Sequence, residues 1–330
     1  MEIAFSECVL VTDESSVGEV RRSAATAAHR LELGEVRAGE LALLATEVSR
    51  NVLIHGGGGE VILAGIRNGD GPVAQILAMD KGQGIANIGL ALSDGYSTAG
   101  TMGGGMGAMK RIASKFDIFT GKTGTVVLLE VGNSKTRHEV EFAGMAIPHP
   151  GERFCGDAWY CHVVDGRTVA MVADGLGHGI GAAEAAQEAI AVFRRRSDLA
   201  PGEILSYVHD ALKKTRGAVA AVVEIRPTER VLVHAGVGNI SAVLHSGGLS
   251  KSLVSFNGTL GLSAQRIHEF RMDWNPDSAL VMHSDGLQTR WDLASYPGLL
   301  SRHPALIGGT LLRDFRRMRD DASIFVLKAA

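Results

Sequence analysis

The sequence predicts a two-domain α+β protein, and three observations lead to that prediction. The chain has 330 residues, and a domain takes about 150 residues on average. Hydrophobic residues make up 45% and charged residues 21%, which is typical of a folded core rather than of a disordered chain. The stretch Gly132–His138 is polar and aperiodic, and the hydrophobic pattern differs on its two sides. We therefore expect one domain over 1–132 and a second over 139–330.

The first half begins with two helical patterns. Residues 15–33 are rich in alanine and place apolar residues at helical spacing, with Gly34 as a stop. A second helix is expected over 36–54 and is ended by a histidine and four glycines at 55–59. The remaining elements of this half are strands over 60–67, 73–79, 116–120 and 125–131, and a helix over 106–115.

The second half consists of short strand patterns interrupted by helices. Strands are expected over 139–146, 158–164, 168–173, 219–225, 231–235, 279–283 and 322–327. Helices are expected over 180–196, 201–215 and 304–318. No internal repeat relates the two halves.

Composition excludes several classes of protein. The 33 Lys and Arg nearly balance the 36 Asp and Glu, which argues against nucleic-acid binding through bulk positive charge. No apolar run approaches the ~20 residues of a membrane-spanning helix, and the first residues lack the layout of a signal peptide. The cysteines, Cys8, Cys155 and Cys161, form no C-x-x-C pair, so no structural zinc site is expected. We expect a cytoplasmic protein with no membrane or nucleic-acid partner.

Glycine is abundant, with 42 residues, and in the first half it clusters near acidic and amide side chains. Glu47 and Asn51 are four residues apart, so they share one helix face. A strand ends at Asp80-Lys81-Gly82-Gln83-Gly84-Ile85, and Gly103-Gly104-Gly105-Met106-Gly107 opens a later helix. A P-loop ending at Gly121-Lys122-Thr123 is excluded, because Phe116 stands where its first glycine is required. A dinucleotide fingerprint from Gly82 fails at Asn87.

This ordered set resembles the GHKL (Bergerat) ATPases, in particular the RsbW/RsbT-type serine kinases of bacterial stress signalling, over residues 15–131. The resemblance implies an α/β sandwich that binds ATP with Mg²⁺. It implies that Glu47 is a catalytic base, that Asn51 holds Mg²⁺ and that Asp80 accepts a hydrogen bond from the adenine amino group. The other implied nucleotide contacts are Gly82, Gly84, Ile85, Gly103, Gly104, Gly105, Gly107, and a Gly-x-Thr element at either Gly124-Thr125 or Gly121–Thr123.

Helix-start glycine N–H groups bind phosphate oxygens, and a carboxylate can polarise an incoming hydroxyl, so the implied chemistry is coherent. Taken singly, a helical Glu and Asn are more often a solvated face, and a glycine run is more often a loop. Serine phosphorylation is therefore one interpretation, and nucleotide binding that only switches the shape of the domain is the other.

Four acidic positions in the second half each lie beside a predicted strand. They are Asp157, Asp174, Asp285 and the pair Asp320-Asp321. Separated by more than 160 residues, they could converge only through a folded sheet. Carboxylates without His or Cys suit Mg²⁺ or Mn²⁺, and two such ions can activate water for attack on a phosphate. Each Asp-Gly taken alone would more often be a turn.

Residues 139–330 resemble the SpoIIE/RsbX branch of the type 2C metal-dependent protein phosphatases. The strings that carry the resemblance are CGDAW, VADGLGHG, GVGN, GTLGL, SDGL and RDDAS. The resemblance implies an α-β-β-α sandwich in which Asp174 bridges two ions and the Gly175 carbonyl binds one. Asp285 and Asp320 would hold the second ion, with Asp321 as the alternative to Asp320, and Asp157 would act directly or through a water. His178 would have a positioning role.

Together the two resemblances predict a bifunctional regulator of a bacterial stress-response pathway. They imply a STAS-domain antagonist or scaffold protein as the phosphoserine or phosphothreonine substrate. Two alternatives stay open. The first domain could sense ATP without catalysis, or the chain could be a non-enzymatic switch that sequesters its partner. Self-association is left open as well.

Overall fold

The computed structural model describes residues 2–68, 71–93, 105–132, 139–164, 166–264 and 267–330. The chain forms two compact units. The first contains residues 1–136 together with 296–314, and the second contains 137–295 together with 315–330. The sequence predicted a continuous second domain over 139–330, whereas the stretch 296–314 is grouped with the first unit.

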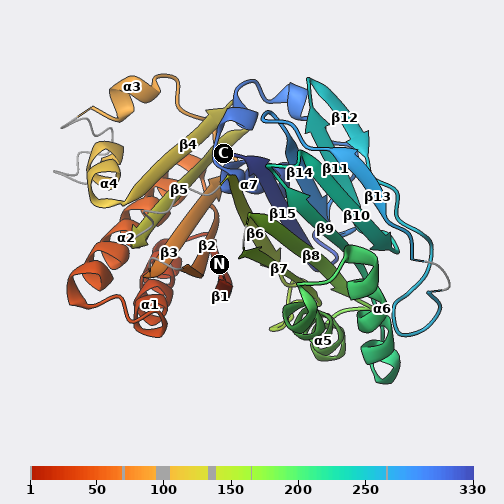
Figure 1. Ribbon diagram of the computed structural model, residues 1–330. Coiled ribbons are helices and arrows are strands. Elements are labelled where there is room, and N and C mark those ends of the chain that lie inside the picture. The colour runs from red at the N-terminus through yellow and green to blue at the C-terminus, as the bar shows by residue number, and fades with distance from the viewer. Residues whose placement is uncertain (1, 69–70, 94–104, 133–138, 165, 265–266) are drawn as a thin grey trace. The chain divides into compact units, whose positions relative to one another are not determined.

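The first unit is built on a five-stranded antiparallel sheet in the order β1-β2-β3-β5-β4 (Figure 1). Its strands are β1 (Glu2–Val11), β2 (Gly59–Asn68), β3 (Gly71–Asp80), β4 (Lys115–Gly121) and β5 (Gly124–Gly132). β3 lies in the middle and pairs along its length with β2 and β5. Asp80 ends this central strand, so its side chain lies at one end of the sheet.

Two long helices cover one face of this sheet, α1 (Glu14–Arg30) and α2 (Glu35–Gly56) (Figure 1). Asp13 caps α1 by accepting a hydrogen bond from the backbone N–H of Ser16 at 2.9 Å. The apolar stripes of both helices are buried against side chains such as Val61 and Ile76 of the sheet. The helical periodicity of the sequence therefore predicted the correct buried faces.

The stretch 296–314 packs on strands of the same sheet and contains most of α7 (Pro304–Phe315). A Cβ on Gly309 would lie 3.0 Å from methyl groups of Leu77 and Val126. Leu77 alternates along β3 with Ile76 and Ala78, which face α1 and α2, so Gly309 lies on the opposite face of the sheet. The small side of the helix at Gly309 allows this close approach.

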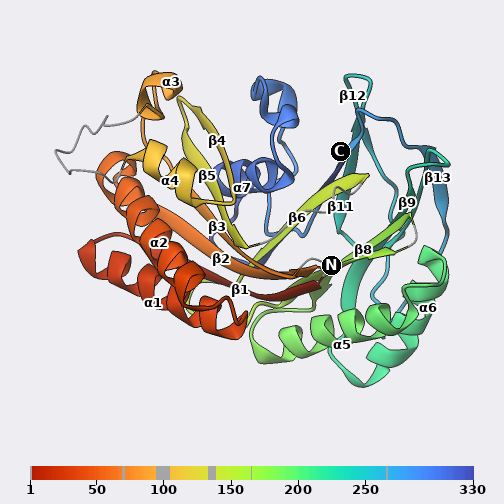
Figure 2. The same ribbon diagram turned by 60° about the vertical axis from the view of Figure 1, so that its left-hand side comes forward.

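The second unit contains two five-stranded sheets (Figure 2). One has the order β13-β10-β9-β8-β7 and the other β12-β11-β14-β15-β6. The strands are β6 (Val140–Ile147), β7 (Asp157–Val164), β8 (Arg167–Gly175), β9 (Ala218–Arg226), β10 (Val231–Val237), β11 (Ser241–Ser246), β12 (Leu249–Ser252), β13 (Phe270–Asp273), β14 (Ala279–His283) and β15 (Ala322–Ala329).

Two hydrophobic cores hold the second unit together. One lies between the sheets and includes Val172, Val223 and Phe325. The other joins the first of these sheets to α5 (Ile180–Arg196) and α6 (Pro201–Ala211), with Phe193 fully buried. The result is two sheets with helices on the outer face of one, a mixed α/β arrangement that positions the ends of β7 and β8 together.

Several elements differ from those predicted. The strands β1, β11, β12 and β13 and the four-residue helix α3 (Ile88–Ala91) were not predicted. α6 ends at Ala211 and continues as a 3₁₀ turn over 212–214, and α7 ends at Phe315 rather than at 318. β1 contains a register shift between Ile3 and Phe5, which breaks the simple alternation that identifies a strand in a sequence.

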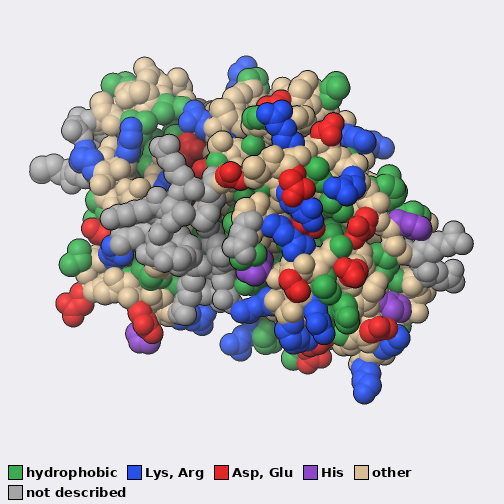
Figure 3. Space-filling view, viewed as in Figure 1, with side chains coloured by type: hydrophobic (Ala, Val, Ile, Leu, Met, Phe, Trp, Pro, Cys, Tyr) green, Lys and Arg blue, Asp and Glu red, His purple; other side chains and the backbone are tan. Residues whose placement is uncertain are grey.

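The described surface of the second unit carries both signs of charge. In Figure 3, Lys and Arg side chains lie among Asp and Glu side chains on the face that is drawn. Within the described ranges, none of the helices combines the length and the apolar character that crossing a membrane requires.

Candidate functional site

The acidic site of the second unit is built first on two neighbouring strands. Asp157 begins β7 and Asp174 lies near the end of β8, and the antiparallel register places them directly opposite each other. Asp157 is 3% exposed, so its carboxyl group is essentially removed from water. Ionised carboxylates in such a pair repel each other unless a cation lies between them.

The remaining acidic residues reach the same place from loops. Asp285 follows β14, and Asp320 and Asp321 precede β15. Asp321 is buried and its Oδ1 accepts a hydrogen bond from the backbone N–H of His149 at 2.8 Å. Asp285 Oδ2 accepts one from Asn239 Nδ2 at 2.9 Å. The structure therefore brings together the aspartates that the sequence analysis singled out, with Asp320 half-exposed and Asp321 buried.

A buried serine connects these strands. Ser284 Oγ donates to Asp157 Oδ2 at 2.5 Å and accepts from the backbone N–H of Ser323 at 3.0 Å. Ser284 and Ser323 are both fully buried. Sequence analysis did not identify Ser284, Ser323 or Asn239, although each lies inside one of the quoted strings: SDGL, RDDAS and GVGN.

Electrostatics shows how closely the carboxylates interact. Burial raises the pKa of Asp157 to about 7, and the hydrogen bond from Ser284 opposes that rise. Burial also raises the pKa of Asp174 to about 9, and the negative charges of Asp157, Asp285, Asp320 and Asp321 raise it further in that order. A site that holds protons this strongly is one that a cation would stabilise.

Glycines allow this close packing. A Cβ on Gly156 would lie 2.7 Å from Asp321 Oδ2, and a Cβ on Gly286 would collide with the backbone carbonyl of Asp321. A Cβ on Gly175 would collide with the backbone carbonyl of Ala182 in α5. Glycine is therefore required at these positions for the loops to approach one another, which gives a physical reason for the repeated Asp-Gly pairs.

The donor set fits a hard divalent cation. It consists of carboxylates, and the buried Oδ2 of Asp321 accepts no N–H or O–H hydrogen bond from the described residues. Within the described ranges, no group of three Asp, Glu, His or Cys side chains is arranged so that it could hold a metal ion as the side chains stand. The fit rests on the carboxylate donors alone, which are the ligands that Mg²⁺ and Mn²⁺ prefer.

His178 lies near this site in the loop that follows β8. Its Nδ1 lies 2.9 Å from Glu152 Oε1, and its ring stacks on the ring of His149 with centroids 4.7 Å apart. The backbone N–H of His149 in turn donates to Asp321, so His178 contacts the aspartates only through His149. This arrangement holds the orientation of its ring.

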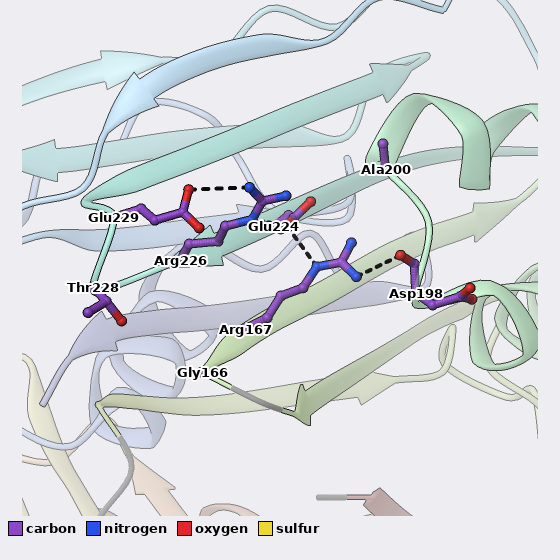
Figure 4. A pocket seen from close by; sticks show the side chains of 8 residues that line it. All are labelled: Gly166, Arg167, Asp198, Ala200, Glu224, Arg226, Thr228 and Glu229. Atoms are coloured by element: carbon purple, nitrogen blue, oxygen red, sulfur yellow. Dashed lines mark hydrogen bonds and ion pairs between the residues drawn. The ribbon is translucent and has the colours of Figure 1, made fainter.

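A polar cavity of about 370 Å³ lies elsewhere in the second unit (Figure 4). Its arginines, Arg167 and Arg226, both bind the buried carboxylate of Glu224, at 2.7 and 2.6 Å. Arg167 begins β8 whereas Asp174 lies near its end, so the cavity is about 23 Å along the strand from the aspartates. Both arginines are already paired with carboxylates, and we assign the cavity a structural role.

The expected nucleotide site of the first unit is centred on Asp80. Its Oδ1 accepts hydrogen bonds from the backbone N–H groups of Gly82, at 2.9 Å, and Thr125, at 3.2 Å. Of the two Gly-x-Thr alternatives, Gly124-Thr125 is the one that lies beside Asp80. Burial raises the pKa of Asp80, and the two backbone hydrogen bonds lower it.

The neighbouring glycines allow the backbone around Asp80 to pack closely. A Cβ on Gly82 would lie 2.6 Å from the His55 carbonyl, and a Cβ on Gly84 would collide with the Gly121 carbonyl. Gly84 also has a φ of +74°, which favours glycine. Ile85 follows, and its backbone N–H donates to Thr120 Oγ1 at 2.9 Å.

Glu47 and Asn51 lie on α2, half-buried, and the end of that helix at Gly56 packs against Asp80. They therefore lie about 2.5 and 1.5 turns from that contact. Gly105 is the N-cap of α4 (Met106–Ile112) and Gly107 is buried in its first turn. Gly103 and Gly104 lie outside the described residues.

Parts of the chain are similar to known proteins. Residues 164–330 match the family described as stage II sporulation protein E (SpoIIE). Phosphoserine phosphatase RsbX of Bacillus subtilis (strain 168) is 28% identical over 138 residues, 42% of this chain and 69% of RsbX. Serine/threonine-protein kinase RsbT of the same organism is 27% identical over 111 residues, 34% of this chain and 84% of RsbT.

The fold has a counterpart among solved structures. A crystal structure of RsbX in complex with magnesium superposes with a TM-score of 0.54 at 23% identity, and covers 60% of this chain and 99% of that one. The match shows that 60% of this chain shares the mixed α/β fold of that structure.

Proposed function

The chain belongs to the SpoIIE family, and from this premise we propose that its second unit removes phosphate from phosphoserine or phosphothreonine on a STAS-domain protein. The observation that carries the proposal is the Asp157–Asp174 pair on neighbouring strands, where burial and then the negative charges of the other aspartates raise the pKa of Asp174. The similarity to RsbX supports it, because RsbX is itself a phosphoserine phosphatase.

The residues of the site have two proposed roles: some would bind the cations, and others hold the metal-binding side chains in position. Asp174, the Gly175 carbonyl, Asp285 and Asp320 or Asp321 would hold Mn²⁺ or Mg²⁺, with Asp157 contributing directly or through a water. The ions, when bound, supply positive charge to the phosphate and lower the pKa of water. Ser284 holds Asp157, and Asn239 holds Asp285, so both act as positioning residues.

The reaction is a hydrolysis. A bond forms between the oxygen of water and phosphorus, the ester P–O bond breaks, and a proton from water ends on the serine or threonine oxygen. The products are the free hydroxyl side chain and inorganic phosphate. No oxidant or further co-reactant is required.

The test is hydrolysis of para-nitrophenyl phosphate by the full chain with Mn²⁺, with EDTA, and as the variant Asp174→Asn. Turnover that needs Mn²⁺ and disappears in the variant is the expected result. Turnover that survives in folded Asp174→Asn would overturn the site assignment. A phosphorylated STAS-domain protein then replaces the small substrate to test the partner.

For the first unit we propose ATP binding with Mg²⁺ and phosphorylation of a serine on the same class of partner. The hydrogen bonds that join Asp80, Gly82 and Thr125, together with the similarity to the kinase RsbT, favour this second activity. The serine oxygen would bond to the γ-phosphorus as the bond to ADP breaks, and Glu47 would take the hydroxyl proton. Asn51 would hold Mg²⁺.

Glu47→Gln separates this proposal from its two alternatives. The variant should bind ATP like the parent chain but transfer no labelled γ-phosphate to a STAS-domain protein. If the parent chain binds ATP and transfers nothing, the first unit is an ATP sensor. If it captures the unphosphorylated partner in stoichiometric amounts with neither reaction, the chain is a sequestering switch.

A further inference from the structure

The stretch 296–314, which we call the inserted segment, joins two regions with different chemistry. By its packing it belongs to the first unit. By its position in the chain it lies between two proposed metal ligands of the second unit, since Asp285 precedes Tyr296 by eleven positions and Asp320 follows Asp314 by six. A change at the first unit's sheet could therefore reach the carboxylates through a short length of chain.

The start of the inserted segment is attached to β4. Asp117 on that strand accepts a hydrogen bond from the backbone N–H of His303 at 3.0 Å and binds Arg302 Nη1 at 3.2 Å. The ring of Tyr296 packs edge-on against Phe119, with centroids 6.3 Å apart. These contacts fix the segment to the strand that leads into the β4–β5 turn.

The end of the inserted segment is attached to that turn. Arg313 is 6% exposed, and its Nη2 donates to Thr123 Oγ1 at 2.7 Å. Arg313 also binds Asp314, whose carboxylate accepts a hydrogen bond from the Tyr296 hydroxyl at 2.7 Å. The turn that carries Thr123 continues into Thr125, which binds Asp80.

Arg313 also acts on Asp80 through its charge: burial raises the pKa of Asp80, and the guanidinium opposes part of that rise, after the backbone hydrogen bonds from Gly82 and Thr125. Its buried Nη1 makes no hydrogen bond with the described residues. A buried donor without a partner costs free energy, so the hydrogen bonds that Arg313 does make matter more. Of its partners, Thr123 is the one that lies in the β4–β5 turn, so the position of that turn affects the position of the guanidinium.

Immediately after the inserted segment, the chain pairs with the loop that carries Asp285. The backbone N–H of Arg317 donates to the Gly286 carbonyl at 2.7 Å, and that of Gln288 donates to the Phe315 carbonyl at 3.0 Å. Gly286 in turn packs against the Asp321 carbonyl. The residues next to the inserted segment are thus bonded to the loops that hold Asp285 and Asp321.

We propose that the inserted segment couples the two sites, so that an adenine nucleotide bound beside Asp80 strengthens divalent-metal binding at the aspartates. The proposal rests on the proposed ATP site. A nucleotide that bonds to Asp80 fixes the β4–β5 turn, and the turn fixes Arg313 through Thr123. The inserted segment is then ordered, and it holds the loops of Asp285 and Asp321 in the positions that bind metal. Because such coupling is reciprocal, metal must strengthen nucleotide binding by the same factor.

The test measures nucleotide affinity rather than turnover. The full chain and Asp174→Asn are titrated with a fluorescent ATP derivative in the same Mn²⁺ buffer, so the metal-bound nucleotide is identical in both. The full chain should bind it more tightly by a factor of roughly 5 to 150. Arg313→Met and Thr123→Val, each compared with its own Asp174→Asn double variant, should reduce that factor to near one.

Two features make the outcomes distinguishable. Thr123 is exposed, so Thr123→Val removes one hydroxyl without burying a defect, even if Arg313→Met folds poorly. Arg226→Met removes an arginine from the separate cavity and should keep the full factor. Equal affinities, or weaker binding by the full chain, overturn the coupling when para-nitrophenyl phosphate is still hydrolysed. No nucleotide binding in any variant overturns the proposed ATP site instead.

Discussion

Ser284→Ala tests the buried connection between β14, β15 and β7. The substitution removes a hydroxyl that donates to the carboxylate of Asp157 and accepts from the backbone of Ser323. A hydrogen bond to a charged group contributes about 1.5–3 kcal/mol, and a buried N–H left without a partner costs about 1–3 kcal/mol. The substitution also removes the cost of burying the hydroxyl itself, which offsets part of these two contributions. We therefore expect the free energy of unfolding to fall by about 3 kcal/mol.

Urea denaturation of the metal-free chain at about pH 8, where Asp157 with its pKa of about 7 is mostly ionised, measures this loss. With a slope of about 2 kcal/mol per molar urea, the midpoint should fall by about 1.5 M. The pKa of Asp157 should rise further, because the Ser284 hydrogen bond now lowers it, and the Mn²⁺ concentration for half-maximal hydrolysis should rise about 10- to 100-fold.

Ser255→Ala is the matched control. Ser255 Oγ is also buried in the second unit but forms no hydrogen bond with the described residues. The same chemical change should therefore not lower the stability, and it should leave the Mn²⁺ dependence unchanged. If Ser284→Ala behaves like Ser255→Ala in both assays, the serine connection has no energetic role and the reasoning is refuted.

Three further outcomes are expected. Asp174→Asn should lower Mn²⁺-dependent hydrolysis by ~10²-fold or more, because it removes a proposed metal ligand. The metal-free variant should stay folded, because the substitution removes the repulsion between Asp174 and the neighbouring carboxylates, and a loss of the folded signal would contradict this. The raised pKa values of Asp157 and Asp174, about 7 and 9, mean that the metal-free folded chain is favoured at low pH and loses stability as pH rises from ~4 toward 9. Mn²⁺ should thus raise the melting temperature more at pH 8 than at pH 5, and an equal shift would refute the assignment. Gly309→Val should destabilise the first unit by about 1–3 kcal/mol in urea denaturation, because a Cβ there already touches Leu77 and Val126, and an unchanged midpoint would contradict the packing.

The hydrophobic periodicity of the sequence predicted most helices and strands, but it did not predict which elements pack against one another. The helix α5 has the predicted bounds, and β14 does as well, because their apolar residues follow one period throughout. β1 was missed, since its register shift interrupts the alternation, and β12 was missed because all four of its residues are exposed. α7 was predicted as a helix, yet ten of its twelve residues are buried, so its pattern indicates no single face and no particular sheet.

The candidate site could be predicted as a list of acidic residues but not as a network. Asp157 and Asp174 are far apart in the chain, and only the register of β7 with β8 shows that they are direct neighbours. Ser284 could not be recognised, because serine before an aspartate is common and its function depends on partners from two other strands. The assignment of ligand roles to Asp320 and Asp321 stays a prediction.

The grouping of residues 296–314 with residues 1–136 has a consequence for how the protein is made. The ribosome synthesises the five strands of the first sheet long before it synthesises α7. The side chains of Leu77, Met79 and Val126, which α7 covers in the folded protein, therefore stay exposed to solvent while most of the second unit is synthesised. Exposed apolar strands of this kind are prone to aggregation. Folding of the first unit is therefore completed only after α7 has been synthesised. A polypeptide cut at residue 132 would lack the helix that covers this face.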